Sequence, residues 1–263
     1  MRTASKLIVA VASVGVLAAA ALAHGNAAPR TKVKGTLTVA IELGNPGFAE
    51  GTLAHPHGFS VDMASALAKR MGLQIRFVDY PFARLFVPGP KPYDAAFEFV
   101  TILPGRERFV DFSIPYLTST QGVLVAKEIK GPITLARLRK LQVCAKEVTT
   151  GSDYVQEVLQ PTALFLQYPT AAGALTALSQ SICDAFVFDL PALLAAKAEA
   201  PGKYGAVVGR VGSAEHYGAV MRTGSPLKPA VDKAIESLRK DGTIAKIADK
   251  NFGAGFASSP LIR

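Results

Sequence analysis

The sequence predicts an α/β fold in two lobes, and three observations lead to this prediction. Apolar segments typical of buried strands alternate with helical patterns from Leu37 onward. The chain after Ala23 has about 240 residues, which exceeds the usual size of one domain. The apolar segment from Asp94 to Ile102 has Thr101 near its carboxyl end and Arg106 just beyond it across a Pro-Gly turn, as expected of a strand that carries a ligand site at its carboxyl end.

The first lobe is expected to open with a strand over residues 35–41, followed by a helix over 61–71. In this helix apolar residues recur near helical spacing, Asp62 lies in the first turn where the helix dipole favours an acid, and Gly72 ends the run. A strand over 73–78 follows. The segment 94–102 lies between Pro92 and Pro104 and predicts a strand buried on both faces. The proline-rich segment before it, PFARLFVPGPKP, predicts a loop.

The second lobe is expected to start at the segment 121–127. It should contain strands over 141–145 and 185–188, a helix from Ser152 and a helix over 171–179. From Tyr217 the chain should return to the first lobe and end in helices over 228–240 and 244–250, separated by Asp241-Gly242.

The N-terminus has the pattern of a secretory signal. Arg2 and Lys6 precede an apolar run, and Ala21-Leu22-Ala23 offers a small-x-small cleavage site. We therefore expect a signal peptide over 1–23, a mature chain from His24 and a periplasmic location. The formal net charge of +9 is spread along the chain without an arginine-rich stripe, so we expect no nucleic acid partner.

Five segments, in order, resemble the family 3 periplasmic solute-binding proteins of polar amino acid ABC transporters. They are VAIELGNPGF from Val39, the stretch from Gly58 to Thr118 with GFSVDMASALAKRMG and YDAAFEFVTILPGRERFVDFSIPYLTS, VCAKEVTTG from Val143, DAFVFDLP from Asp184, and the closing stretch from Tyr217 to Gly253. The resemblance implies a two-lobed type II periplasmic binding protein fold, each lobe a mixed sheet flanked by helices. Two crossover strands, near 115–119 and 215–217, would act as the hinge. Lobe 1 would comprise 24–118 and 217–263, and lobe 2 would comprise 119–216.

The resemblance also implies roles for single residues in an interlobe cleft. Arg106 matches the arginine that clamps a ligand carboxylate, and Thr101 matches the hydroxyl residue that assists it. Asp189 matches the acid that receives the ammonium group, and Thr150 matches a residue that points at the carboxylate. Lys146 matches a position that lines the side-chain pocket. Asp189 and Thr150 are also plausible helix N-caps on local sequence alone, and both readings stay open.

The sequence departs from the family pattern at several of these positions. Glu98-Phe99 replaces small residues, and a carboxylate in so apolar a strand should meet a cation, because its desolvation costs several kcal/mol. The cation is either Arg84 or Lys146 of the protein, which we favour, or a charged group of the ligand. Glu42 and Asn45 are also predicted cleft positions. The family more often has an acid and an aromatic residue there, so the ring that would cover the ligand is missing. Tyr80 or Phe82 could supply such a ring instead.

The two cysteines, Cys144 and Cys183, are expected to be free thiols. Their positions on the predicted strands imply an offset of roughly four residues, or about 13 Å, which is beyond the reach of a disulfide. His55 and His57 resemble half a metal site but have no third clustered ligand, so we expect no metal and no cofactor.

Three functions are compatible with the sequence. The first is a periplasmic receptor, monomeric and not an enzyme, that binds a small polar or zwitterionic, amino acid-like solute with hinge closure and delivers it to an inner-membrane ABC permease. The second is an enzyme similar to cyclohexadienyl dehydratases, with Glu98 or Glu42 as general acid. The third is an accessory protein of a periplasmic quinoprotein dehydrogenase.

Overall fold

The computed structural model describes residues 30–253 and 259–263, so the predicted signal peptide over 1–23 lies outside the described residues. Helices are found at α1 (Phe59–Arg70), α2 (Pro104–Glu107), α3 (Leu135–Leu138), α4 (Thr150–Asp153), α5 (Ala171–Ser179), α6 (Leu190–Glu199), α7 (Lys228–Lys240) and α8 (Thr243–Phe252), with a 3-10 turn η1 (Phe82–Phe86) and a π-helical segment η2 (Tyr154–Leu159). None of the described helices is long and apolar enough to cross a membrane.

The strands are β1 (Thr36–Ile41), β2 (Glu50–Thr52), β3 (His55–His57), β4 (Gln74–Asp79), β5 (Ala95–Thr101), β6 (Val110–Phe112), β7 (Leu117–Val125), β8 (Val143–Lys146), β9 (Phe165–Tyr168), β10 (Ala185–Asp189) and β11 (Val207–Arg222). Apart from the β2-β3 hairpin, the described strands form one curled sheet in the order β4-β1-β5-β11-β7-β10-β8-β9, with β6 beside β11. The strands at each end of this order run parallel, as β4-β1-β5 and as β10-β8-β9.

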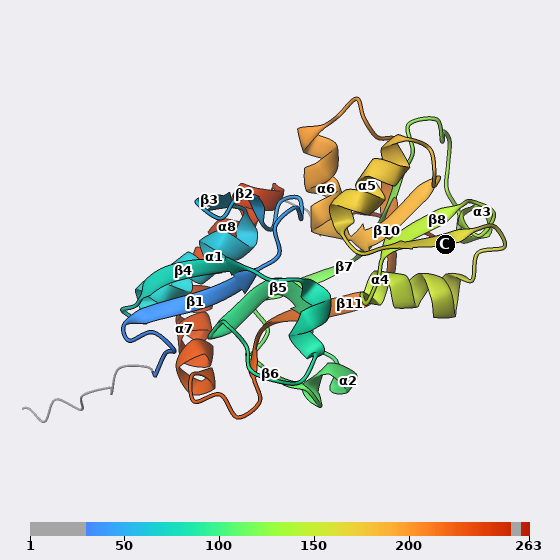
Figure 1. Ribbon diagram of the computed structural model, residues 1–263. Helices are drawn as coiled ribbons and strands as arrows, with labels where there is room; N and C mark the ends of the chain where they lie inside the picture. Colours follow the sequence, from blue (N-terminus) through green and yellow to red (C-terminus); the bar gives the residue numbers. More distant parts are fainter. Residues whose placement is uncertain (1–29, 254–258) are drawn as a thin grey trace, which may run out of the picture.

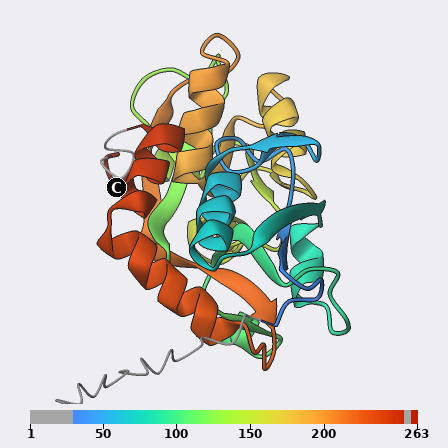
Figure 2. The ribbon, with the colours of Figure 1, turned by 90° about the vertical axis from the view of Figure 1, so that its left-hand side faces the viewer.

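Figure 1 shows two lobes, one built on β4-β1-β5 with α1, α7 and α8, the other built on β10-β8-β9 with α3 to α6. The two long strands β7 and β11 pass between them and pair antiparallel, with Tyr217 opposite Leu117 and Glu215 opposite Ser119. In Figure 2 the red helices α7 and α8 lie against the cyan helix α1. The predicted α/β architecture with two crossing strands is therefore confirmed.

Helix α1 illustrates how local sequence sets an element and its packing. Most of its apolar side chains are buried, and Met63 and Leu67 are fully buried in the core next to the sheet. Asp62 in the first turn accepts hydrogen bonds from Lys250 (2.8 Å) and Asn251 (2.9 Å) of α8. The amphipathic pattern thus places α1 on the sheet, and its acid joins it to the C-terminal helix.

Strand β5 is buried along its whole length, as predicted, but it contains an irregularity. The pairing with β11 shifts between Gly218 and Val220, and Phe99 has a φ of 44°. This left-handed conformation is unusual for a bulky residue. Phe99 thus occupies a backbone conformation that suits glycine better than a bulky side chain.

Cys144 and Cys183 form a disulfide, with their Cα atoms 5.9 Å apart, so the expectation of free thiols was wrong. That expectation extended β10 backwards as a straight strand. In the structure Asp184 and Ala185 both donate to the carbonyl of Gln142 at 2.7 and 3.2 Å, and the chain turns there. The turn brings Cys183 back over β8, where Cys144 lies.

The predicted division assigns the C-terminal residues to lobe 1, but the last described residues contact the segment predicted as lobe 2. The backbone of Arg210 accepts from Ile262 (2.9 Å) and donates to Pro260 (2.8 Å), and Leu135 donates to Arg263 (3.1 Å). Residues 259–263 therefore lie against the segment 119–216. The predicted lobe boundaries otherwise stay a prediction.

Candidate functional site

The candidate site lies where the carboxyl ends of β5, β8 and β10 meet the hinge strands. Such ends of parallel strands are where open α/β sheets hold ligands. Thr101 is the last residue of β5, Lys146 the last of β8 and Asp189 the last of β10. All three side chains are buried. The structure thus brings together residues from segments that are far apart in the sequence.

Arg106 spans the two lobes. Its guanidinium donates to the carbonyl of Thr101 at 3.0 Å and to the carbonyl of Val148 at 3.1 Å, and it lies over the rings of Phe82 (5.4 Å) and Phe86 (5.0 Å). Burial lowers the pKa of Arg106, an effect that nearby carboxylates oppose. Arg106 therefore lies at the junction of the lobes, and its role as a carboxylate clamp stays a prediction.

Thr101 and Thr150 converge on one carboxylate, that of Glu215 on the hinge strand β11. The hydroxyl of Thr101 donates to Glu215 Oε2 at 2.6 Å and that of Thr150 donates to the same oxygen at 2.9 Å. Gln121 Nε2 donates to Oε1 at 3.2 Å. The helix cap at this point is Thr149, whose hydroxyl accepts from the backbone of Ser152. Thr150 is therefore free to point into the junction.

Asp189 is buried beside the same group. Tyr217 donates its hydroxyl proton to Asp189 Oδ1, and Gln121 Nε2 lies 3.5 Å from that oxygen. Asp189 holds the N-cap position of α6, yet its side chain makes no capping hydrogen bond. Burial, together with the charge of Glu215, raises the pKa of Asp189 to about 7.

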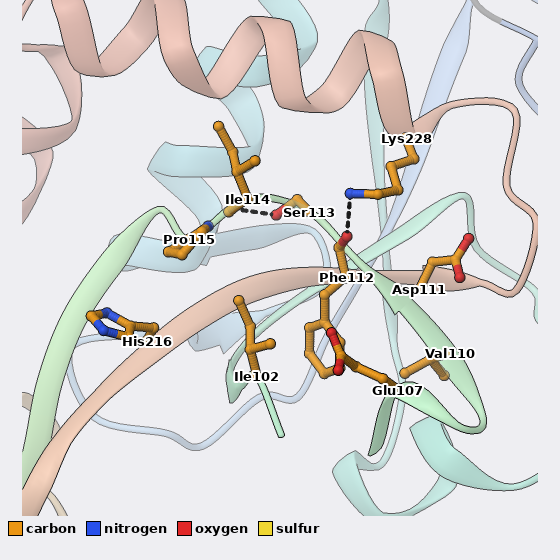
Figure 3. Close-up of a pocket in the computed structure, with 10 residues that line it drawn as sticks. All are labelled: Ile102, Glu107, Val110, Asp111, Phe112, Ser113, Ile114, Pro115, His216 and Lys228. Atoms are coloured by element: carbon orange, nitrogen blue, oxygen red, sulfur yellow. Dashed lines mark hydrogen bonds between the residues drawn. The ribbon is translucent and has the colours of Figure 1, made fainter. Parts of the chain in front are cut away.

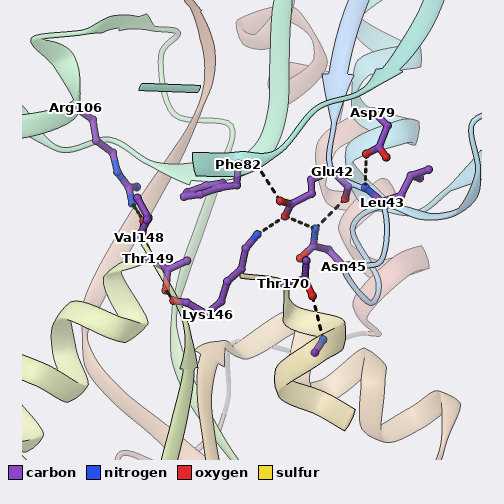
Figure 4. Close-up of polar contacts among 11 residues, drawn as sticks. Glu42, Leu43, Asn45, Asp79, Phe82, Arg106, Lys146, Val148, Thr149 and Thr170 are labelled. Atoms are coloured by element: carbon purple, nitrogen blue, oxygen red, sulfur yellow. Dashed lines mark hydrogen bonds and ion pairs between the residues drawn. The ribbon is translucent and has the colours of Figure 1, made fainter. Parts of the chain in front are cut away.

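Lys146 and Glu42 form an ion pair that crosses the junction, as Figure 4 shows. Glu42 also accepts from the backbone of Phe82 (3.0 Å) and from Asn45 Nδ2 (3.1 Å). The ammonium group of Lys146 lies 4.8 Å from the centre of the Phe82 ring. Phe82 therefore lies at the junction, where the sequence suggested an aromatic lid, whereas Tyr80 packs edge-on against Tyr93 at 5.2 Å.

Glu98 is 1% exposed, and neither of its carboxylate oxygens has a hydrogen-bond partner among the described residues. The favoured expectation, a structural pair with Arg84 or Lys146, was wrong. Lys146 is instead paired with Glu42, and Arg84 lies over the ring of Tyr80 at 5.6 Å. Burial raises the pKa of Glu98 well above its usual value, the charge of Glu42 adds to this, and Lys146 opposes it.

Aromatic rings surround Phe99 next to these polar groups. Phe99 stacks on Phe48 with ring centres 4.1 Å apart and meets the edges of Phe188 and Tyr217 at 6.0 and 6.4 Å. Such packing fixes the bulged end of β5. Phe99 thus replaces the small residue of the resembling family with a rigid aromatic wall.

Two hollows flank the junction. One, of about 510 Å³, lies at its mouth between α2 and the loop after β8, and Arg106 and Val148 both line it. The other, of about 490 Å³, lies beside the hinge (Figure 3) and is lined by Ile102, Glu107, Val110, Asp111, Phe112, Ser113, Ile114, Pro115, His216 and Lys228. No group of three or more metal-binding side chains is found in the described part of the chain.

Sequence reasoning missed Glu215, Gln121 and Tyr217 as members of this site. Glu215 and Tyr217 were noted only as hinge positions, because the sequence shows no pattern that points their side chains at Thr101 or Asp189. The pairing of β11 with β7 shifts between Val211 and Glu215, and Gly212 in this stretch has a φ of 70°. Such a bulge changes which face a side chain takes.

Comparison with known proteins identifies the family. Residues 37–254 match the family model of bacterial extracellular solute-binding proteins, family 3. The chain is 28% identical to the L-cystine-binding protein TcyJ of Escherichia coli K12, with 94% of each chain covered, and 27% identical to ABC transporter arginine-binding protein 1 of the same strain, with 74% of this chain and 81% of the relative covered. A solved ancestral arginine-binding protein bound to arginine has a TM-score of 0.74 and 30% identity, covering 84% and 99%.

These findings decide among the three functions. The family and its named members are binding proteins, so this chain binds a solute and is not an enzyme. They lend no support to a dehydrogenase partner. Extracellular or periplasmic residence is a property of the family as a whole. The chain belongs to the bacterial extracellular solute-binding proteins, family 3.

Proposed function

We propose that this protein is the periplasmic receptor of an ABC importer and that it holds a small polar solute with a cationic group between its two lobes. The site would comprise Arg106, Thr101, Asp189, Thr150, Lys146, Glu98, Phe99, Glu42, Asn45 and Phe82. Relatives that are named as arginine-binding and cystine-binding proteins support a solute of amino acid size.

The observation that carries this proposal is a set of buried acceptors that lack donors. Both oxygens of Glu98, Oδ1 of Asn45 and Oε1 of Gln121 have no hydrogen-bond partner among the described residues. A buried polar atom without a partner costs about 1–3 kcal/mol, and more if it is charged. A solute with N–H donors and a positive charge would remove that cost, and it would do so only when bound.

Closure of the lobes follows from contacts that need both lobes at once. The Lys146 to Glu42 ion pair and the bond from Arg106 to Val148 join lobe 1 to lobe 2. They are absent if the lobes separate about β7 and β11. A solute that contacts groups of both lobes would bind the closed form more tightly and so shift the population towards it, the form that an inner-membrane permease would receive.

A thermal-shift screen of the ligand-free chain from His24 onward tests this proposal. The compounds are amino acids, amines and small organic acids, and a dye reports unfolding because the chain has no Trp. A solute at a hundred times its dissociation constant adds about 2.7 kcal/mol and should raise Tm by roughly 5 to 10 °C. A cooperative melt that no compound shifts would contradict the proposal. Amino-terminal sequencing of the exported protein should find His24 first.

A further inference from the structure

Glu215 fills the position in the junction that is equipped to hold a carboxylate. Two hydroxyls and one amide converge on it, from Thr101 at the end of β5, from Thr150 at the start of α4 and from Gln121 on β7. These donors come from both lobes and from the hinge. Convergent donors from separate elements are what binds a carboxylate in a protein. Here the carboxylate is supplied by the chain itself.

The backbone holds Glu215 at this point. It lies on β11 opposite Ser119 of β7, directly after the shift in pairing that includes Gly212. The φ of 70° at Gly212 is a conformation that glycine adopts without strain. Because Glu215 is part of a strand that links the lobes, it stays near the junction whether the lobes are open or closed.

Arg106 is the cation that would attract a second carboxylate, but its guanidinium already donates to two backbone carbonyls. Arg106 donates to the carbonyls of Thr101 and Val148, at 3.0 and 3.1 Å. Any further carboxylate placed beside Thr101 would also face Asp189 and Glu215. Like charges at such distances repel, and the raised pKa of Asp189 already reflects that repulsion in addition to burial.

Several buried acceptors of the site have no donor in the described part of the chain. Among the described residues, the carboxyl group of Glu98, Oδ1 of Asn45 and Oε1 of Gln121 are buried without a hydrogen-bond partner, and an N–H group of a solute could donate to each of them. Acidic groups are also numerous here. Glu42, Glu98, Asp189 and Glu215 lie near the cations Lys146 and Arg106, and burial raises the pKa of Glu98 and Asp189, so that a bound cation would favour their ionised forms.

We infer that Glu215 is a built-in carboxylate that determines specificity, so that the solute is a small amine or guanidine without a carboxylate group. This inference rests on the proposed function and narrows its ligand class. The solute's N–H groups satisfy the unpartnered acceptors, and Glu215 takes the place and the donors that an amino acid's carboxylate would need.

Pairs of compounds that differ only by the carboxylate test this inference. Calorimetry compares agmatine with arginine and cadaverine with lysine, on the wild type, Glu215→Ala, Glu215→Gln and the control Glu236→Gln. Glu236 lies on the exposed face of α7, so its replacement removes the same charge away from the junction. We expect the wild type and Glu236→Gln to bind the amine of at least one pair about tenfold or more tightly than the amino acid, the value of one charge-assisted contact.

The two substitutions at Glu215 should behave differently. Glu215→Ala vacates the position and should bring the amino acid's affinity up to or beyond that of the amine. Glu215→Gln keeps an oxygen for Thr101 and Thr150 and should keep the preference for the amine. If Glu215→Ala fails to fold, Glu215→Gln still provides a folded variant at this position in which the preference between amine and amino acid can be measured.

The outcomes separate the inference from the proposed function. If the wild type binds amino acids as tightly as their amines, and Glu215→Ala leaves that ratio unchanged, the inference is overturned while the receptor proposal stands. If neither class binds to any variant, both are overturned. If amino acids bind only after Glu215→Ala, the blocking role of Glu215 is supported.

Discussion

Replacing Glu98 by Gln should change how the stability of this protein depends on pH. Glu98 is 1% exposed and has no hydrogen-bond partner in the part of the chain that the structure describes, and burial raises its pKa well above the usual 4.5. The unfolded chain therefore releases this proton at a lower pH than the folded chain does. In the wild type, the contribution of Glu98 to the free energy of unfolding is largest at low pH and falls as the pH rises above 4.5.

The size of the effect follows from linkage. One proton held more tightly in the folded state lowers the free energy of unfolding by about 1.4 kcal/mol per pH unit, until the pH reaches the folded pKa. Gln does not titrate, so Glu98→Gln removes this slope. The side-chain amide of Glu98→Gln would also lack hydrogen-bond partners, which lowers the free energy of unfolding by about 1–3 kcal/mol. This cost is the same at every pH, so it shifts the stability profile without changing its slope. The stability of Glu98→Gln relative to the wild type should therefore increase from pH 5 to pH 8.

Urea unfolding followed by far-UV circular dichroism measures both curves on the ligand-free protein. The matched control is Glu236→Gln, an exposed position whose profile should run parallel to that of the wild type. A constant difference between Glu98→Gln and the wild type over pH 5 to 8, within about 0.5 kcal/mol, would refute the assignment of a raised pKa to Glu98. The same substitution should weaken binding of a cationic solute, because Gln cannot release the proton that Glu98 would lose beside a bound cation.

Three further predictions concern other residues. Cys144→Ala combined with Cys183→Ala should lower the free energy of unfolding by about 4 kcal/mol, since the bridge closes a loop across 39 residues; an unchanged urea midpoint would contradict this. Arg106→Ala should weaken solute binding about tenfold in calorimetry while Tm changes little, because it removes a contact between the lobes; equal affinity would count against it. Phe99→Gly should be about 1 kcal/mol more stable than Phe99→Ala, the reverse of the usual order in a strand, because the φ of 44° suits glycine; the usual order in urea unfolding would exclude this.

Much of the fold follows from local sequence. The helices over 171–179 and 228–240 were predicted with the bounds that the structure shows, and the buried strand β5 was predicted within a residue at each end. Periodicity and flanking prolines are local signals, so they can be recognised without knowledge of the tertiary structure. Short or irregular elements such as β9 and the full length of β11 were missed. They are held by tertiary pairing rather than by a strong pattern of their own.

The sequence by itself determined the family and the alternation of strands and helices, and it placed the carboxyl ends of three strands within one residue of where they lie. It also determined that Glu98 stands in an apolar strand and that its charge needs an explanation. Only the tertiary structure decided how these groups are partnered. In the structure Lys146 forms an ion pair with Glu42, and Cys183 forms a disulfide with Cys144. Glu215 accepts hydrogen bonds from both Thr101 and Thr150. The physical reason is that partners across the hinge are set by bulges and turns, where a shift of one residue reverses the face that a side chain takes.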